Sequence, residues 1–322
     1  MQGLPYYSRG QMQTDNSFDV AVVADLCADM LFRGNVRPVY GQVEQFVDDY
    51  QIELGGSAAI FASQFTRLGG RVALHGIVGE DLLGRFLSER IAALGISTQY
   101  LSTTSRSKTP VGLGLLAHDD RAMLTHKGCL HEITVDSVQR SGVLTAARHL
   151  HIAGYYLLEE LQPHWPTVLS ALKERGVSVS LDTNWSPLGD WDSVRALLPY
   201  IDVFLPNEGE ALLISGKDDL DEAGRSLAGV TGLTVIKCGA QGAVAFSGTE
   251  RRPFAVPKTL LEDLRIVDTT GAGDNFDAGF IFAWLQGATL ADCVALGMKC
   301  ATASLGAIGG IEGQLLREDS VR

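Results

Sequence analysis

Short, nearly continuous apolar runs alternate with helical patterns along most of this chain, which restricts the possible folds more than any other feature. The first run, 19–26, is rich in β-branched residues, and similar runs recur at 71–77, 149–152, 177–181, 202–205 and 233–237. Such runs are typical of strands buried on both faces of a parallel sheet. Helical patterns at 57–68, 81–94 and 163–175 lie between them and stop at glycines. The sequence therefore predicts a three-layer αβα fold around a doubly wound, mostly parallel sheet.

Two stretches depart from this alternation and indicate a small β-sheet outside the main one. In 46–54, apolar and polar residues alternate at period two, so one face of a strand there would be wet. In 111–126, two apolar runs flank Asp119-Asp120-Arg121, the pattern of a hairpin. We expect one domain over 18–316, with strands of a lid inserted at about 36–54 and 109–127. Two edge strands of the main sheet are the alternative.

The charge balance excludes several classes of partner. The chain has 322 residues, with 26 Lys and Arg against 38 Asp and Glu, and a formal net charge of −12. A protein whose affinity depends on a broad basic face does not have this balance, so we expect neither nucleic acid nor a membrane surface as a partner. A small anionic ligand stays compatible, because the N–H groups of a helix N-terminus can bind phosphate whatever the net charge.

The cysteines and the N-terminus point to the cytoplasm. The five cysteines form no Cys-x-x-Cys pair, which predicts reduced thiols and no zinc site. Residues 1–17 are polar and lack the basic and apolar regions of a signal peptide, so we expect a flexible N-terminal tail. No stretch approaches the roughly 18 apolar residues that a membrane-spanning helix needs.

A glycine-rich turn that leads into a helical pattern is the most informative local feature. It reads Asp-Thr-Thr-Gly-Ala-Gly-Asp over 268–274 and precedes an apolar run that ends at 285. Because Gly271 and Gly273 have no side chain, the amides of 271–273 can converge at the positive end of the helix dipole and hold an anion. Asp274 would repel a bound phosphate, yet it makes sense as a base that takes a proton from an attacking hydroxyl. A helix capped only by glycines and an aspartate is the alternative.

This segment resembles the C-terminal signature of the ribokinase-like, or PfkB, family of carbohydrate kinases, and it satisfies that signature over 268–281. The family's N-terminal signature is matched by Gly55, Gly56, Ala58, Ala62, Gly69 and Gly79. Between the two, Asn207-Glu208-Gly209-Glu210 resembles the family's Asn-x-x-Glu motif, and 237–242 resembles its strand-to-turn ATP loop. The resemblance covers about 19–310.

The resemblance implies an enzyme that transfers the γ-phosphoryl group of ATP to a substrate hydroxyl, with Mg²⁺ as cofactor. Asp274 would be the base, and the anion hole would be formed by Gly271, Ala272 and Gly273. Contacts to the acceptor would come from Asp29, Gly55, Gly56 and Ser57, and contacts to the nucleotide from Asn207, Lys237, Gly239 and Gly242. Glu210 would act on Mg²⁺ through water. A monovalent cation such as K⁺, which many relatives hold, would lie near Asp268, Thr270, Ala307 and Gly309.

Several of these residues also have a purely structural interpretation. Asp29 fits a turn after the first strand, and Lys237 fits the solvated end of a strand. Asn207 and Glu210 fit the first turn of a helix, where a carboxylate is favourable. The histidines of the run 149–152 are expected to be core residues rather than ligands.

The identity of the acceptor is left open by these motifs. Ile60 stands where the family has an asparagine that usually touches the sugar, and Ser57 replaces a lysine that some members carry. The arginine that some members place two residues after the position of Asn184 is absent. These departures favour a neutral sugar or polyol, with a nucleoside as the alternative because Ile60 would offer an apolar patch. A relative that binds a sugar or nucleoside as a sensor, without turnover, is the alternative from another class.

The predicted lid also bears on assembly. In the family, such a lid closes over the substrate and often forms a dimer interface. Its apolar residues here need a partner, so we expect a homodimer through Tyr50, Ile52, Leu54, Val111 and Leu113.

Overall fold

The computed structural model describes residues 17–117, 121–262 and 264–320, so the predicted N-terminal tail lies almost entirely outside the described residues. Within them, the main sheet has nine strands in the order β13-β12-β11-β10-β9-β8-β1-β4-β5. All neighbours from β11 to β5 pair parallel, and β12 and β13 pair antiparallel at one edge. Their bounds are β1 (Val20–Val23), β4 (Val72–Gly79), β5 (Leu101–Thr104), β8 (His149–Ile152), β9 (Ser178–Leu181), β10 (Val203–Phe204), β11 (Leu233–Lys237), β12 (Ala243–Ser247) and β13 (Glu250–Phe254).

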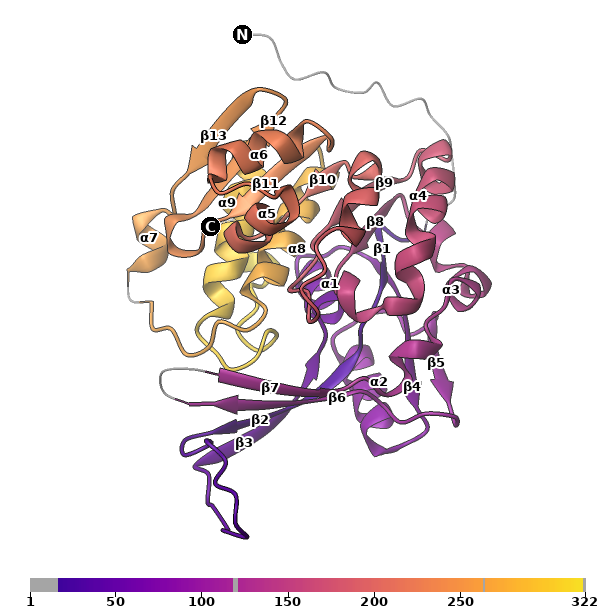
Figure 1. Cartoon of the computed structure of the whole chain (residues 1–322), viewed down its shortest axis with the longest axis vertical. Coiled ribbons are helices and arrows are strands. Elements are labelled where there is room, and N and C mark those ends of the chain that lie inside the picture. Colours follow the sequence, from indigo (N-terminus) through magenta and orange to yellow (C-terminus); the bar gives the residue numbers. More distant parts are fainter. Residues whose placement is uncertain (1–16, 118–120, 263, 321–322) are drawn as a thin grey trace.

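Helices cover both faces of this sheet (Figure 1). The core consists of two clusters of buried apolar side chains, one on each face of the sheet. Alternate residues of β1 contribute to both: Ala21 and Val23 belong to the first cluster, and Val20 and Val22 belong to the second. The first cluster is covered by α3 (Val135–Ser141), α4 (Trp165–Glu174), α5 (Glu208–Ser215) and α6 (Leu220–Ala228). The second is covered by α1 (Ser57–Arg67), α2 (Leu82–Ala93), α8 (Ala272–Leu285) and α9 (Leu290–Ser304). The remaining helices are α7 (Lys258–Leu261) and α10 (Arg317–Ser320). The predicted three-layer fold is confirmed.

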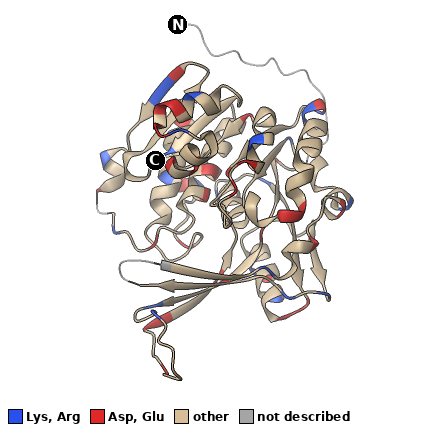
Figure 2. Cartoon of the chain, in the orientation of Figure 1, with Lys and Arg blue, Asp and Glu red and all other residues tan. Residues whose placement is uncertain are grey.

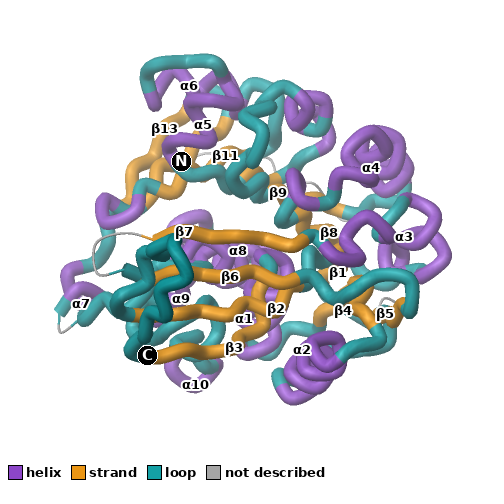
Figure 3. The backbone as a smooth tube through the Cα atoms, turned by 60° about the horizontal axis from the view of Figure 1, so that its bottom comes forward, coloured by secondary structure: helices purple, strands orange, loops and turns teal. Residues whose placement is uncertain are grey.

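A separate small sheet is formed by β2 (Cys27–Arg33), β3 (Asp49–Gly55), β6 (Val111–Leu116) and β7 (Arg121–His126), in the order β3-β2-β6-β7 (Figure 3). The alternative of two edge strands in the main sheet is therefore wrong, and the hairpin over 111–126 is confirmed. The interpretation of Asp29 as a turn residue is also wrong. β1 ends at Val23, and the chain continues into β2, where Asp29 pairs with Glu53 and Gly112. The loop 34–48 between β2 and β3 projects away from the body of the molecule (Figure 1).

The pairing register gives the small sheet two chemically different faces. Asp29, Leu31 and Glu53 share one face, and an added Cβ at Gly309 would lie 3.4 Å from the Glu53 side chain. The opposite face carries Met30, Phe32, Tyr50, Ile52 and Leu113. The first face is therefore turned toward the helical body, and the second is apolar and partly exposed.

The order of the strands fixes where a site can form. From β1 the chain builds the sheet first toward β4 and β5, and then on the other side from β8 onward. In open α/β sheets, ligands bind at the carboxyl ends of the strands, at such a reversal of order. Asp25, after β1, and Gly154, after β8, meet there, because a Cβ on Gly154 would lie 2.7 Å from the Asp25 carboxyl group.

Candidate active site

The glycine-rich turn at 271–273 forms the start of α8. Gly271 is left-handed, with φ of 71°, and a Cβ there would lie 2.8 Å from the Cα of Gly310. Only glycine fits this position without strain. Ala272 and Gly273 occupy the first turn of α8, where helical geometry offers the N–H groups no intrahelical acceptor. The N–H of Ala272 donates to Thr269 O at 3.4 Å, and the positive end of a fourteen-residue helix lies at this turn. An anion hole formed by 271–273 stays a prediction.

Asp274 follows in the same turn, and its side chain is almost completely buried. It is surrounded by charged groups from several elements: Asp25 after β1, Asp182 after β9, Lys237 at the end of β11, and Asp277 one turn along α8. Burial, and next the negative charge of Asp182, raise the pKa of Asp274 well above its ordinary value, while Lys237 and a hydrogen bond from Ser57 oppose this rise. A raised pKa makes a carboxylate a stronger proton acceptor.

Lys237 lies beside this turn in a buried ion-pair cluster. Its Nζ is 2.7 Å from Asp182 Oδ2 and 3.1 Å from Asp277 Oδ2, and a Cβ on Gly273 would lie 3.3 Å from the same Nζ. Burial opposes the ionisation of Asp182, but Lys237 and hydrogen bonds outweigh it and hold the pKa of Asp182 below its ordinary value. Burial raises the pKa of Asp277 well above its ordinary value. The interpretation of Lys237 as a solvated residue is therefore wrong; its predicted contact with a nucleotide stays a prediction.

Asn207 and Glu210 close the N-terminus of α5 as a capping box. Asn207 Oδ1 accepts from the Glu210 N–H, and Glu210 Oε2 accepts from the Asn207 N–H, both at 2.9 Å. The structural interpretation of this pair is thus confirmed. The predicted role of the same residues at the nucleotide and Mg²⁺ stays a prediction. Burial, and next the charge of Asp182, raise the pKa of Glu210 to about 7. The neighbouring turn at 239–242 ends at Gly242, with φ of 100°, where a Cβ would lie 2.0 Å from Phe254 O.

The glycine pair at 55–56 makes room for two carboxylates. A Cβ on Gly55 would lie 2.1 Å from Asp29 Oδ2, and one on Gly56 would lie 2.4 Å from the carbonyl oxygen of Asp25 and 3.2 Å from its carboxylate Oδ1. Burial raises the pKa of Asp29 to about 6. The structure therefore brings Asp29, Gly55 and Gly56 together on the side of α1 that faces the small sheet.

The residues predicted to hold a monovalent cation also meet. Asp268 Oδ1 accepts hydrogen bonds from the N–H and the hydroxyl of Thr270, at 3.0 and 2.9 Å. Asp268 Oδ2 accepts from the N–H of Gly309 at 2.9 Å, which ties the turn before α8 to the segment of Ala307 and Gly309 after α9. Whether a cation binds there stays a prediction.

Two expectations for other residues are refined. The Ile60 side chain is only 5% exposed, because it packs under Gly271 and Gly310, so it offers no apolar patch to a nucleobase. His149 and His151 are buried strand residues, as expected, and both bond Ser180 Oγ at 2.8 Å.

Sequence reasoning chose Asp29 rather than Asp25 from the segment 25–29 and gave no role to three other residues, so it missed four residues that the structure places in this cluster. Three of them, Asp25, Asp182 and Asn184, follow buried strands. The fourth, Asp277, lies in the first turns of α8. A polar residue near the end of an apolar run was the available signal for the first three, because the ends of parallel strands converge at one edge. Asp277 had no such signal, since it lies within an apolar helical run.

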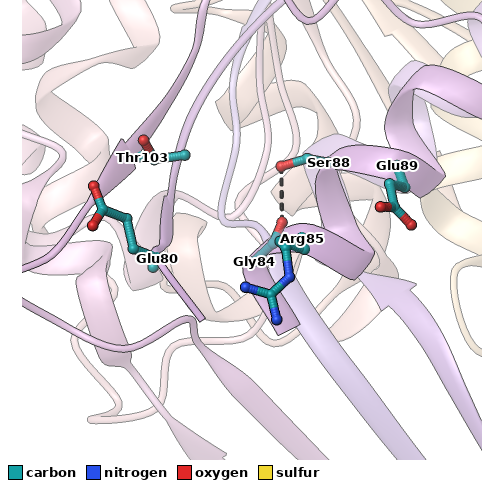
Figure 4. Close-up of a pocket in the computed structure, with 7 residues that line it drawn as sticks. Glu80, Gly84, Arg85, Ser88, Glu89 and Thr103 are labelled. Atoms are coloured by element: carbon teal, nitrogen blue, oxygen red, sulfur yellow. Dashed lines mark hydrogen bonds between the residues drawn. The ribbon is translucent and has the colours of Figure 1, made fainter. Parts of the chain in front are cut away.

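Other surface features of the described residues do not compete with this cluster. A hollow of about 300 Å³ lies beside the start of α2 and is lined by Glu80, Arg85, Ser88, Glu89 and Thr103 (Figure 4). It contains none of the clustered residues. Lys and Arg are scattered over the cartoon in Figure 2. Among the described helices, none has the length and apolar character needed to cross a membrane.

Comparison with known proteins gives a consistent result. The model of the pfkB family carbohydrate kinases matches residues 19–315. A cytidine kinase of Thermococcus kodakarensis is 27% identical over 76% of this chain and 85% of its own length. A ribokinase of Haemophilus influenzae is 28% identical over 80% of this chain and 82% of its own length. Among solved structures, a putative ribokinase II from E. coli in complex with ATP and Mg²⁺ has a TM-score of 0.82 at 21% identity, covering 94% of this chain and 98% of its own.

Proposed function

Because this chain belongs to the pfkB family of carbohydrate kinases, we propose that it transfers the γ-phosphoryl group of ATP to a hydroxyl of a neutral sugar or related polyol. The observation that carries this proposal is the buried Asp274 in the first turn of α8, next to the N–H groups of Ala272 and Gly273. Phosphoryl transfer needs mainly positioning and charge stabilisation, which such a turn supplies.

In this mechanism, Asp274 accepts the proton of the acceptor hydroxyl as its oxygen attacks phosphorus. The amides of 271–273 and the dipole of α8 stabilise negative charge on the phosphoryl oxygens. The carboxyl groups of Asp182, Asp274 and Glu210 outnumber the single ammonium of Lys237, which pairs with Asp182 and acts on the other two through its charge. This excess fits a divalent cation, so Glu210 and Asn207 would hold Mg²⁺ through water, and Mg²⁺ would neutralise phosphate charge. Lys237, Gly239 and Gly242 would border the nucleotide.

The charge of the acceptor side supports a neutral acceptor. The charge of Asp25 contributes to the raised pKa of Asp29, and the charge of Asp29 contributes to the raised pKa of Glu53. The three carboxyl groups therefore lie near one another beside the small sheet. Arg90 pairs with Glu53 and Glu312, which removes it as a partner for a substrate anion. Carboxylates at this density accept hydrogen bonds from hydroxyl groups and repel a sugar acid or a sugar phosphate. A nucleoside is the second candidate, favoured by the likeness to a cytidine kinase.

Further proposals concern the lid and a monovalent cation. The small sheet would act as a lid that excludes water from the reacting groups. Its outer face would join a second copy of the chain in a homodimer. The segments of Asp268 and Gly309 would position backbone carbonyls for K⁺.

The test is the release of ADP from Mg·ATP in a coupled assay, with neutral sugars, inositol, nucleosides, sugar acids and sugar phosphates as acceptors. We expect turnover with a neutral sugar or a nucleoside and none with the anionic acceptors. Asp274→Asn should keep the fold and ATP binding but lose about 10²–10⁴ in kcat, the usual contribution of a positioned base. Binding of a sugar without turnover of any acceptor would support a sensor and contradict the proposal, and near-normal kcat in the variant would remove Asp274 from the mechanism.

A further inference from the structure

A buried side-chain amide joins the start of α8 to the segment of the chain that follows α9. Asn275 comes directly after Asp274 in α8, and it is fully buried. Its Nδ2 donates to the carbonyl oxygen of Gly271 at 2.8 Å and to that of Gly310 at 2.9 Å. The first bond closes the glycine-rich turn, and the second ties this turn to the C-terminal segment 310–315.

Gln314, in that segment, fixes the orientation of the Asn275 amide. Gln314 Nε2 donates to the carbonyl oxygen of Ile60 and to Asn275 Oδ1, both at 2.9 Å. Its Oε1 accepts from the hydroxyl group of Ser63 at 2.6 Å. Because the carbonyl oxygen of Ile60 can only accept, the NH₂ group of Gln314 must lie on this side. Asn275 Oδ1 therefore accepts, and Asn275 Nδ2 faces the two carbonyl oxygens that it bonds.

The packing at the turn is equally close. A Cβ on Gly271 would lie 2.8 Å from the Cα of Gly310 and 3.0 Å from Ile60 Cγ2. A Cβ on Gly310 would lie 2.6 Å from Ile60 Cδ1. Ile60 belongs to α1, so three parts of the chain meet here: α1, the turn that opens α8, and the C-terminal segment.

The start of α1 is fixed separately, on the side where the acceptor is expected. The Asp25 carboxylate, after β1, accepts hydrogen bonds from the N–H groups of Ser57 and Ala58, each at 3.2 Å. Asn184, after β9, donates from Nδ2 to Ser57 Oγ at 2.7 Å. The contact of Ser57 with an acceptor stays a prediction. α1 is thus bonded at its start to the ends of two strands, and one turn later to the network that holds the start of α8.

We propose that Asn275 and Gln314 are positioning residues, which hold the turn 271–274 against α1 so that Asp274 reaches the acceptor hydroxyl. This inference rests on the proposed kinase reaction. Both protons of each NH₂ group are donated within the protein, so the two amides act on the reaction through the turn. A displacement of about 1 Å at reacting groups can cost about 10²-fold in rate, so the release of such a hold is measurable.

The experiment compares Asn275→Ala with the matched control Gln64→Ala. Gln64 is also a fully buried amide, and it bonds the same C-terminal segment to α1 through the carbonyl oxygen and the N–H of Leu315, at 2.9 and 3.0 Å. These two bonds do not reach α8. We expect similar decreases in the urea midpoint for both variants. In Asn275→Ala, kcat should fall by about 10–100-fold with KM for ATP and acceptor within about twofold of the wild type, whereas Gln64→Ala should lose less than about threefold in kcat.

Two further variants separate the bonds of the network. In Asn275→Ser, the new hydroxyl can donate to the carbonyl oxygen four residues earlier in the helix, which is that of Gly271, so part of kcat should return. Gln314→Met keeps the length of the side chain but frees the Asn275 amide to turn, so kcat should fall by less than in Asn275→Ala. Equal losses of kcat in Asn275→Ala and Gln64→Ala, or a raised KM at unchanged kcat, would overturn the proposal. If Asn275→Ala does not fold, Asn275→Ser and Gln314→Met are compared with Gln64→Ala by the same criterion.

A second readout does not need turnover. The backbone N–H of residue 275 donates to Gly271 O at 2.9 Å, the same oxygen that accepts from the Asn275 side chain. Its hydrogen exchange, followed by NMR, should be about three- to tenfold faster in Asn275→Ala than in the wild type and unchanged in Gln64→Ala. An unchanged rate in Asn275→Ala would overturn the proposal. If the wild type phosphorylates no acceptor but this exchange becomes faster, the kinase reaction fails while the hold on the turn stands.

Discussion

Lys237 places an ammonium group between two carboxylates that are almost completely buried. Its side chain is 13% exposed, and those of Asp182 and Asp277 are 5% and 0% exposed. Burial disfavours the charged form of both carboxyl groups, and the charge of Lys237 is the largest influence that opposes burial in each. Removal of the ammonium would leave a buried charge without a partner.

We therefore expect Lys237→Met to lower the free energy of unfolding by about 3–5 kcal/mol, the usual cost of breaking a buried pair. Lys173→Met is the matched control, because the Lys173–Asp202 pair is 35% and 31% exposed and should contribute only about 0–1 kcal/mol. Urea unfolding followed by circular dichroism measures both. Equal losses in the two variants would mean that Asp182 finds water or a proton instead of Lys237.

The same residues show which parts of the candidate site could be predicted from the sequence and which could not. Asp274 and the amides beside it could be identified, because glycines, a carboxylate and a helix follow one another in the chain. The cluster around Lys237 could not, because its members come from β9, β11 and α8 and meet only after the sheet is assembled. The sequence also does not show that Asn184 lies against Ser57, because one residue follows β9 and the other opens α1.

At the level of elements, the accuracy of prediction follows the strength of each periodic pattern. β8 and β11 coincide with their predicted runs, and α2 begins after Asp81, whose side chain caps it. β2, β5, β12 and β13 were not predicted. β5 reads Leu-Ser-Thr-Thr, and β13 is an exposed edge strand that contains Pro253 and three charged residues. Such short or polar strands are defined by their neighbours rather than by their own sequence.

β8 also introduces a dependence of stability on pH. His149 and His151 are 0% and 1% exposed. Burial lowers the pKa of His149 well below its ordinary value and lowers that of His151 to about 3. Above about pH 6.5, both histidines are neutral whether the chain is folded or unfolded. Below this pH only the unfolded chain takes up protons, so stability is lost as the pH falls.

Each histidine should contribute a fall of about 1.4 kcal/mol per pH unit in the free energy of unfolding between about pH 6.5 and 4.5, while Asp29 and Glu210, whose pKa values are raised, contribute in the opposite direction. His151→Phe should remove the contribution of one histidine from the wild-type slope, because a phenylalanine ring can stack on Phe61 in place of His151 but does not titrate. Urea unfolding at several pH values measures the slope. An unchanged slope in the variant would show that His151 becomes protonated within the fold.

At the scale of the whole molecule, the outer end of the small sheet carries an apolar face that is partly exposed in the part of the chain that the structure describes. The five residues named from the sequence for this face, Tyr50, Ile52, Leu54, Val111 and Leu113, all fall on one side of the sheet by register. Tyr50 is 62% exposed and stacks on Phe32 of the same face, and Leu124 of β7 is also 62% exposed. A face of this kind pairs most simply with its own copy about a two-fold axis, which places the same residues on both sides of the interface.

We therefore expect sedimentation equilibrium at micromolar concentration to show a dimer. Tyr50→Glu should raise the dissociation constant by at least about tenfold, because a buried tyrosine at the centre of an interface is a frequent hot spot and a buried carboxylate opposes its copy across the axis. Leu188→Glu is the control, since Leu188 is 87% exposed on the loop after β9, outside the small sheet. A wild type that stays monomeric, or equal effects of the two variants, would mean that the outer face of the small sheet does not join two chains.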